Sequence, residues 1–292
     1  MNAVSYCTAN IAGLNIFYRE AGKRNKPTIL LLHGFPSSSH MFRDLMPVLA
    51  DSFHLIAPDY PGFGYSSMPP VNEFEYTFDN VANVIEQLLV SLDVEQYSVY
   101  LMDYGASVGF RLFAKRPEAV QSLIIQNGNA YDDGLTEFWG IMRAYWSDRN
   151  AETEKPIRDQ LTPENTRYQY QQGARDPQSM CPDAWTLDQA FLDRPGNRQI
   201  QLELLYDFQK DLQCYPRWQE CLRRHQPPAL IVWGTGDPYF STEGAHAYLR
   251  DLEKVELYLC DGGHFLLEEQ CGYIAERIRE FLNASVSVPA SP

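Results

Sequence analysis

The sequence lacks the features that mark disulfide-rich, zinc-binding and membrane-spanning proteins. Its six cysteines are scattered and include no Cys-x-x-Cys pair, which argues against a disulfide framework and against a zinc site. No uninterrupted apolar run reaches the ~18 residues that a membrane helix requires. We therefore expect reduced, mostly structural cysteines, no metal, no organic cofactor and no membrane partner.

Basic residues are also scarce. The chain has 24 Lys and Arg against 38 Asp and Glu, a formal net charge of -14 at pH 7, and such a charge repels nucleic acids and anionic lipid. The first twenty residues lack the basic start, apolar run and small-residue cleavage site of a secretory signal. We expect a cytoplasmic protein, a monomer or a homodimer, whose partners are a small substrate and water.

What the sequence does contain is an alternation of apolar runs and helical periods. Runs that are apolar on both faces predict buried parallel strands, and the alternation predicts a wound α/β sheet. Two earlier stretches, 4–9 and 14–19, alternate in polarity and predict an antiparallel hairpin at the sheet edge. The buried strands are expected at 28–32, 53–57, 97–102, 123–126, 229–233 and 255–259.

The alternation stops after about residue 129. The next ninety-odd residues are rich in Trp, Tyr, Gln and Pro and show helical patches without a buried strand, so they predict an inserted helical cap. Gln-Pro-Pro at 226–228 then returns the chain to a strand. The sequence predicts core segments at 1–129 and 227–283, the cap at 130–226, and an unpatterned tail at 284–292.

Four loops that follow predicted strands carry unusual polar residues. In an open parallel sheet, functional groups collect just beyond the carboxyl ends of the strands. These loops are His-Gly-Phe-Pro at 33–36, Asp-Tyr-Gly at 103–105, Gly-Thr-Gly-Asp-Pro at 234–238 and Asp-Gly-Gly-His-Phe at 261–265. We expect them to form one site.

Two residues compete as the nucleophile of that site. Gly-Ala-Ser-Val-Gly at 105–109 matches the Gly-x-Ser-x-Gly motif and points to Ser107. That motif requires the nucleophile at the junction of strand and helix, and the strand 97–102 ends directly before Asp103, so Ser107 falls about one turn into the helix. This spacing favours Asp103, although an aspartate at a helix start can also be a simple cap.

These motifs resemble the epoxide hydrolase and haloalkane dehalogenase branch of the α/β-hydrolase superfamily. The resemblance spans nearly the whole chain and also rests on Asp-Tyr-Pro-Gly-Phe-Gly-Tyr-Ser at 59–66. It implies an α/β-hydrolase fold, with a mostly parallel eight-stranded sheet flanked by helices and an inserted helical cap. In that fold the nucleophile stands some fourteen residues before the proline that closes its helix, and Asp103 stands fourteen before Pro117, whereas Ser107 stands ten before it.

The resemblance also implies a mechanism. Asp103 would attack an sp³ carbon and form an alkyl ester, His264 would take a proton from the water that hydrolyses this ester, and Asp237 would orient His264. The backbone N–H groups of Phe35 and Tyr104 would form the oxyanion hole.

The carboxylate that orients the histidine has one alternative position in this branch. A subgroup of dehalogenases carries it after an earlier strand, and the matching residue here is Asn127. An amide cannot serve as a carboxylate, which leaves Asp237.

The leaving group depends on the cap. Epoxide hydrolases protonate the opening oxygen with cap tyrosines, and Tyr206 stands 31 residues before Asp237 (237 minus 206), close to where such enzymes keep one of the pair. The second tyrosine stays open among Tyr145, Tyr168 and Tyr170.

Dehalogenases instead bind the departing halide with an asparagine after His-Gly and a tryptophan after the nucleophile. This chain has Phe35 and Tyr104 there, so the remaining indole donors are Trp139, Trp146 and Trp185. The sequence thus favours epoxide hydrolysis to a diol, with haloalkane dehalogenation as the alternative. A serine-type esterase and a non-catalytic ligand receptor are further alternatives, and the aromatic cap suggests an apolar or aromatic substrate.

Overall fold

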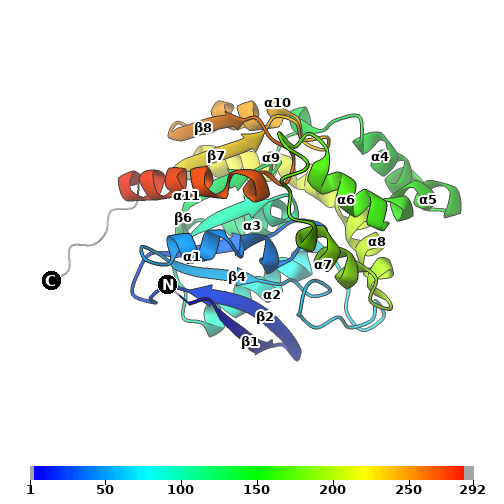
Figure 1. Cartoon of the computed structure of the whole chain (residues 1–292), viewed down its shortest axis with the longest axis horizontal. Helices are drawn as coiled ribbons and strands as arrows, with labels where there is room; N and C mark the ends of the chain where they lie inside the picture. The colour runs from blue at the N-terminus through cyan, green and yellow to red at the C-terminus, as the bar shows by residue number, and fades with distance from the viewer. Residues whose placement is uncertain (1–2, 286–292) are drawn as a thin grey trace.

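The computed structural model describes residues 3–285. Within these residues the strands form one eight-stranded sheet in the order β1-β2-β4-β3-β5-β6-β7-β8 (Figure 1). The pairs β1/β2 and β2/β4 are antiparallel and the other pairs are parallel. The strands are β1 (Ser5–Ile11), β2 (Leu14–Ala21), β3 (Thr28–Leu32), β4 (His54–Pro58), β5 (Tyr97–Met102), β6 (Val120–Gln126), β7 (Ala229–Gly234) and β8 (Val255–Cys260).

The six strands predicted from apolar runs are all present, with ends that differ by at most three residues. The predicted hairpin is present as β1 and β2. The expectation that all six of these strands are buried was wrong for β8, which is half exposed along most of its length. As the last strand in the sheet order, β8 has a strand neighbour on one side only, which explains the difference.

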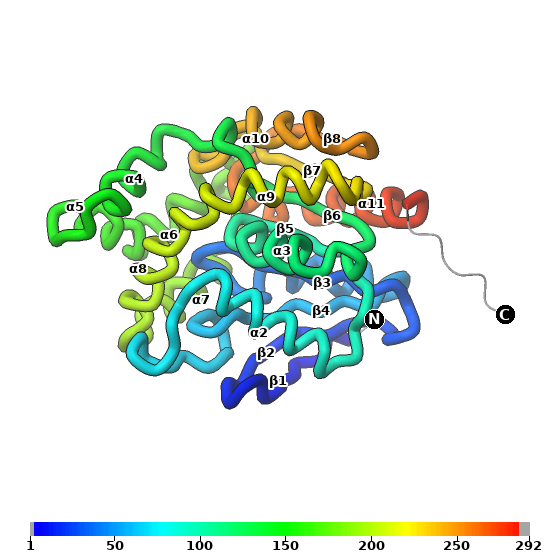
Figure 2. The backbone as a smooth tube through the Cα atoms, turned by 180° about the vertical axis from the view of Figure 1, so that it is seen from behind, coloured from blue at the N-terminus to red at the C-terminus, as the bar shows by residue number. Residues whose placement is uncertain are grey.

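Helices cover both faces of the sheet, as the two opposite views show (Figures 1 and 2). Helices α1 and α11 contact each other on one face, whereas α3 contacts α2 and α9 on the other. The helices around the sheet are α1 (Leu45–Leu49), α2 (Phe78–Ser91), α3 (Tyr104–Lys115), α9 (Gln209–His225), α10 (Thr242–Ala247) and α11 (Leu266–Ser285). Short 3-10 turns are η1 (Ser39–Phe42), η2 (Pro117–Ala119), η3 (Asp132–Gly134) and η4 (Tyr248–Arg250).

Local sequence explains the start of α2. The Thr77 hydroxyl accepts the N–H of Asn80 at 3.2 Å and so satisfies a free donor of the first turn. The apolar residues that follow at helical spacing are buried against the sheet.

The segment expected as a helical insertion is helical. Its helices gather at one end of the molecule in Figure 1, and α9 then runs back along α3 (Figure 2). The inserted helices are α4 (Trp139–Ser147), α5 (Ala151–Asp159), α6 (Pro163–Gln171), α7 (Pro182–Leu192) and α8 (Asn197–Asp207). Helix α9 ends at His225, one residue before the predicted end of the insertion.

The chain end departs slightly from expectation. The predicted tail begins at residue 284, but α11 continues to Ser285. Residues 286–292 of the predicted tail lie outside the described residues. All six cysteines are free, and no helix within residues 3–285 has the length and apolar character needed to cross a bilayer.

Three glycines from distant segments bring backbones into direct contact. Gly173 follows α6, Gly236 follows β7 and Gly263 follows β8. A Cβ atom on Gly173 would lie 1.8 Å from the carbonyl oxygen of Gly236, and one on Gly263 would lie 2.7 Å from that of Gln172. Because no side chain fits between them, the end of α6 rests directly on the loops that follow β7 and β8.

A buried polar cluster attaches α9 to α3. The Arg111 guanidinium donates from Nη1 to Asp211 Oδ1 at 2.6 Å and from Nε to Asp79 Oδ1 at 2.6 Å. The Ser107 hydroxyl donates to the other oxygen of Asp211. Since Arg111 and Asp211 are both buried, removal of one charge leaves the other without full compensation.

We therefore expect Asp211→Ala to lower the free energy of unfolding by about 3 kcal/mol, the usual cost of breaking a buried ion pair. Urea denaturation followed by circular dichroism measures the change. The matched control is Glu118→Ala, which removes the partner of Arg116 from an exposed pair and should cost less than about 0.5 kcal/mol. Equal losses in the two variants would contradict a structural role for the buried pair.

Candidate active site

Asp103 lies on the turn between β5 and α3. Its backbone has φ 50° and ψ -114°, a conformation that residues other than glycine rarely adopt. Two neighbouring glycines permit the tight turn. A Cβ on Gly34 would lie 2.4 Å from Asp103 Cβ, and one on Gly105 would lie 2.3 Å from the carbonyl oxygen of Leu32. The turn therefore presents the Asp103 side chain at the carboxyl end of β5, next to the loop that follows β3.

Two backbone N–H groups converge on the Asp103 carboxylate. The N–H of Phe35 donates to Oδ1 at 2.7 Å, and the N–H of Tyr104 also donates to this carboxylate. Burial raises the pKa of Asp103 above the ordinary aspartate value, while the neighbouring His264 and these two N–H groups oppose the shift. The two residues expected to form an oxyanion hole are therefore both placed against the carboxylate of Asp103.

His264 stands between two carboxylates. Its Nδ1 lies 2.7 Å from Asp237 Oδ2 and its Nε2 lies 3.9 Å from Asp103 Oδ2. A carboxylate only accepts hydrogen bonds, so Nδ1 carries the proton and Nε2 faces Asp103. Burial opposes the charged imidazolium, but the charges of Asp237 and Asp103 outweigh it and the pKa of His264 is raised. The structure thus brings Asp103, His264 and Asp237 together.

Asp237 is itself held by two further donors. Its Oδ1 accepts the N–H of Tyr239 at 2.7 Å, and its Oδ2 accepts Asn127 Nδ2 at 2.7 Å. Asn127 is fixed in turn by the backbone of Gly234, whose N–H donates to Oδ1 at 2.9 Å. The sequence alone indicates only that Asn127 cannot be the acid, whereas in the structure its amide orients Asp237.

A narrow, mostly apolar cavity lies above these residues. The space open to the centre of a water-sized sphere is about 40 Å³, enough for only a few waters because one water needs roughly 10–15 Å³ on this measure. The cavity is bounded by both the sheet loops and the inserted helices. Its lining residues are Phe35, Asp103, Tyr104, Phe138, Trp139, Gln160, Gln169, Leu205, Tyr239 and His264.

Of the cap tyrosines and tryptophans expected to protonate or bind the leaving group, only Trp139 lines the cavity. Trp139 lines the cavity, but its indole N–H donates to the carbonyl oxygen of Tyr239 at 2.9 Å. Tyr145 is buried with its hydroxyl 3.4 Å from the carbonyl oxygen of Leu202, away from the cavity. Tyr206 does not line the cavity either, and its ring lies 4.8 Å from the guanidinium of Arg149.

The physical reason for the position of Tyr206 is helix rotation. Its neighbour Leu205 lines the cavity, and one residue along an α-helix turns the side chain by about 100°. Tyr170 is also engaged elsewhere, since its hydroxyl donates to Asp188 Oδ2 at 2.5 Å. Tyr168 is exposed. The structure therefore brings none of the four expected tyrosines into the cavity lining.

Three polar cavity residues were missed by sequence analysis, namely Gln160, Gln169 and Tyr239. Tyr239 had a usable signal, because it stands two residues after Asp237 on the same loop. The glutamines had none, because the insertion contains many glutamines and the direction of each depends on helix ends that the sequence does not define.

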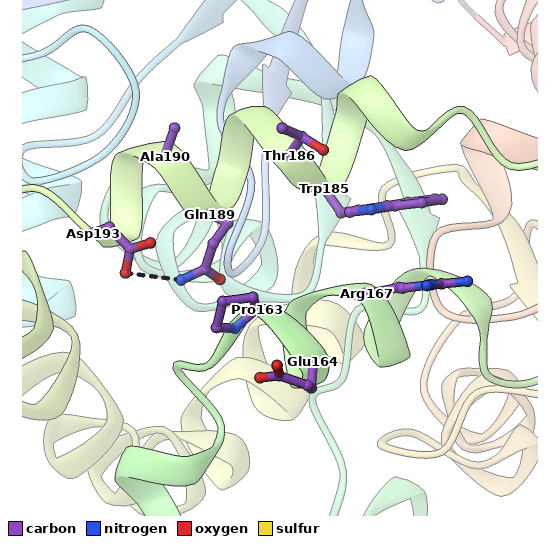
Figure 3. Close-up of a pocket in the computed structure, with 8 residues that line it drawn as sticks. All are labelled: Pro163, Glu164, Arg167, Trp185, Thr186, Gln189, Ala190 and Asp193. Atoms are coloured by element: carbon purple, nitrogen blue, oxygen red, sulfur yellow. Dashed lines mark hydrogen bonds between the residues drawn. The ribbon is translucent and has the colours of Figure 1, made fainter.

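A second, more open hollow lies between α6 and α7 (Figure 3). There the guanidinium of Arg167 lies 6.0 Å from the ring of Trp185, and Gln189 Nε2 donates to Asp193 Oδ1 at 3.0 Å. None of Asp103, His264 and Asp237 lines it, whereas Asp103 and His264 both line the narrow cavity.

Comparisons with known proteins identify the family of the chain. A family model described as alpha/beta hydrolase fold matches residues 27–270. An uncharacterized hydrolase of Saccharomyces cerevisiae is 43% identical over 270 residues, covering 91% of this chain and 92% of that protein. A haloalkane dehalogenase of Psychrobacter cryohalolentis is 36% identical over 291 residues, covering 92% of this chain and 88% of that protein.

Solved structures show the same fold at lower identity. The haloalkane dehalogenase DatA of Agrobacterium tumefaciens superposes with a TM-score of 0.79 at 21% identity and covers 97% of this chain and 98% of its own. The epoxide hydrolase CorEH superposes with a TM-score of 0.77 at 20% identity and covers 97% and 99%. These structures show the fold, and the family match together with the Psychrobacter cryohalolentis relative shows that the chain is a hydrolase that belongs to the alpha/beta hydrolase fold family, in the branch of the haloalkane dehalogenases and epoxide hydrolases.

Proposed function

We propose that this hydrolase opens small epoxides to diols through an alkyl ester on Asp103. The observation that carries the proposal is the position of the Asp103 carboxylate, which accepts the Phe35 N–H at 2.7 Å and lies 3.9 Å from His264 Nε2. A carboxylate is already ionised near neutral pH and can attack an sp³ carbon without a base. The narrow, mostly apolar cavity suits a small apolar substrate and water.

The second step would hydrolyse the ester. His264 Nε2 takes a proton from water, and the resulting hydroxide attacks the carbonyl carbon of the Asp103 ester. Asp237 stabilises the imidazolium through Nδ1. The N–H of Phe35 donates to Oδ1, the oxygen that would become the oxyanion, and the N–H of Tyr104 acts on the same carboxylate; one such donor contributes about 3 kcal/mol.

Haloalkane dehalogenation is the second candidate, since the Psychrobacter cryohalolentis relative bears that name. A halide needs free N–H donors around the leaving atom. The indole N–H of Trp139 and that of Trp146 both donate to backbone carbonyls, at 2.9 Å and 2.8 Å, and Phe35 and Tyr104 occupy the expected donor positions. These contacts favour an oxygen leaving group.

We also propose that the protein is cytoplasmic. Six free cysteines fit a reducing compartment.

His264→Gln is the variant that tests the ester. We expect it to form an adduct with small epoxides and to accumulate it, because alkylation needs only Asp103 whereas hydrolysis needs the base. Intact-mass spectrometry after incubation with 1,2-epoxypropane and 1-bromopropane measures the adduct, and peptide mapping locates it.

The mass separates the two candidates. Epoxide addition keeps every substrate atom, whereas dehalogenation loses the halide. Labelling of Ser107 by an acyl ester, with no adduct on Asp103, would mean that the carboxylate nucleophile is wrong.

Ser107→Ala tests the serine alternative. The Ser107 hydroxyl donates to buried Asp211 and does not line the cavity, so we expect turnover within about twofold of the unchanged protein. The lost hydrogen bond to a buried charged group should lower the free energy of unfolding by about 2 kcal/mol. Loss of turnover in a folded Ser107→Ala protein would support the serine esterase instead.

The raised pKa values predict how each step depends on pH. Hydrolysis requires neutral His264, whose pKa is raised, so its rate should fall about tenfold per pH unit below that pKa. Alkylation requires ionised Asp103. Burial raises the pKa of this carboxyl although His264 and two N–H groups oppose the shift, but the ordinary aspartate pKa lies about 2.6 units below that of histidine, so alkylation should persist to lower pH than hydrolysis.

Rapid-quench mass spectrometry between pH 5 and 9 separates the two rates. We expect the ester to accumulate in the unchanged protein toward the acid end. A hydrolysis rate that stays constant over this range would rule out His264 as the base.

A further inference from the structure

We propose that Tyr239, in the loop after β7, is the acid that protonates the leaving oxygen, and that Gln169 on α6 binds the same oxygen. This inference rests on the proposed epoxide opening and names its missing proton donor. The proton then comes from Tyr239 in a loop that follows a strand. The inserted helices contribute the carboxamide of Gln169 instead of tyrosine hydroxyls.

The first observation is an unused hydroxyl. Tyr239 lines the cavity and is 7% exposed, and its hydroxyl has no hydrogen-bond partner within the described part of the chain. A buried hydroxyl without a partner destabilises the fold, because it has lost its hydrogen bonds to water. A substrate oxygen in the cavity would supply the partner.

The second observation is that Tyr239 is held in place. Its N–H donates to Asp237 Oδ1 at 2.7 Å, and its carbonyl oxygen accepts the indole N–H of Trp139 at 2.9 Å. Its ring lies 5.1 Å from the His264 ring at an interplanar angle of 76°. The phenol is therefore fixed beside the base and in the same cavity as Asp103.

The charge environment keeps the phenol protonated. Burial, together with the nearby ionisable groups of Asp237, Tyr168 and Asp103, raises the pKa of Tyr239 above its ordinary value. An alkoxide is about as basic as hydroxide, whose parent water has a pKa of ~15.7, so it can still take this proton. Tyr239 is thus a donor that does not ionise at neutral pH.

Tyr104 carries the other unpartnered hydroxyl among the residues that line the cavity. The pKa of the Tyr104 hydroxyl is raised by burial and by the charge of Asp103, and then by the charges of Asp211 and Asp207. Its ring packs 4.8 Å from Phe78 and 6.1 Å from Phe208. These contacts place the Tyr104 hydroxyl among α2, α8 and α9, away from His264.

Gln169 completes the oxygen site from the inserted helices. It is 3% exposed, lines the cavity, and makes no side-chain hydrogen bond within residues 3–285. Its amide carries two N–H donors and cannot give up a proton, so it can bind the oxygen while Tyr239 protonates it. The contact between Gly173 and Gly236 fixes α6 above the Tyr239 loop.

The proton balance closes over the two steps. Asp103 Oδ2 bonds to an epoxide carbon, the C–O bond breaks toward oxygen, and that oxygen takes the Tyr239 proton. In the second step His264 takes a proton from water, the hydroxide adds to the Asp103 carbonyl carbon, and the departing diol oxygen takes the proton back from His264. The acid form of Asp103 then loses its proton, which restores Tyr239.

The test uses the full chain with His264→Gln, in which alkylation is observed alone. We expect added Tyr239→Phe to slow adduct formation with 1,2-epoxypropane about 100-fold or more, the usual contribution of a general acid. Gln169→Leu should slow it about tenfold, as expected for one hydrogen bond. The matched control is Tyr145→Phe, which removes a buried hydroxyl outside the cavity and should change the rate less than twofold.

A second epoxide distinguishes proton donation from packing. The fluorines of 1,1,1-trifluoro-2,3-epoxypropane stabilise the developing alkoxide, so the loss in Tyr239→Phe should be at least tenfold smaller for it than for 1,2-epoxypropane. Equal losses on both epoxides, or a rate equal to that of Tyr145→Phe, would overturn the assignment. Failure of the proposed function is distinguishable, because His264→Gln alone would then form no adduct on Asp103.

Discussion

The site depends on holding one carboxylate in a backbone turn that an aspartate disfavours. A non-glycine residue with φ of 50°, as at Asp103, carries about 1–3 kcal/mol of strain. The turn persists because the buried strand β5 ends directly before it and because two N–H groups bind the carboxylate that it presents. Gly34 and Gly105 are both required by this arrangement, since each faces atoms that leave no room for a Cβ.

The end of β6 organises the other half of the site. Gln126 Nε2 donates to the carbonyl oxygen of His264 at 3.2 Å, and Asn127 Nδ2 donates to Asp237 Oδ2 at 2.7 Å. Two consecutive amides thus fix the loops that follow β8 and β7. Because these amides are neutral, they orient the histidine and the acid without adding charge to a region that already holds two carboxylates.

The sequence predicts the sheet better than it predicts the inserted helices that border the cavity. Strands such as 97–102 are recognisable because buried parallel strands are apolar on both faces, and the loops after them carry Asp103, Asp237 and His264 together. Ser107 shows the limit of motifs, since its match to Gly-x-Ser-x-Gly lies one helical turn beyond the junction. The cavity residues on the inserted helices could not be predicted, because a rotation of one residue on α8 exchanges Tyr206 for Leu205. Only tertiary packing decides which of the two side chains faces the cavity.

The contact among Gly173, Gly236 and Gly263 also constrains how the sequence can vary. Each glycine faces backbone atoms of another segment, so a larger side chain at one position cannot be offset by a smaller one at the others. In a library of random substitutions, these three positions should be intolerant individually and should show no pairwise rescue. Side-chain packing in the core behaves differently, because there a loss of volume at one residue can be compensated by its neighbour.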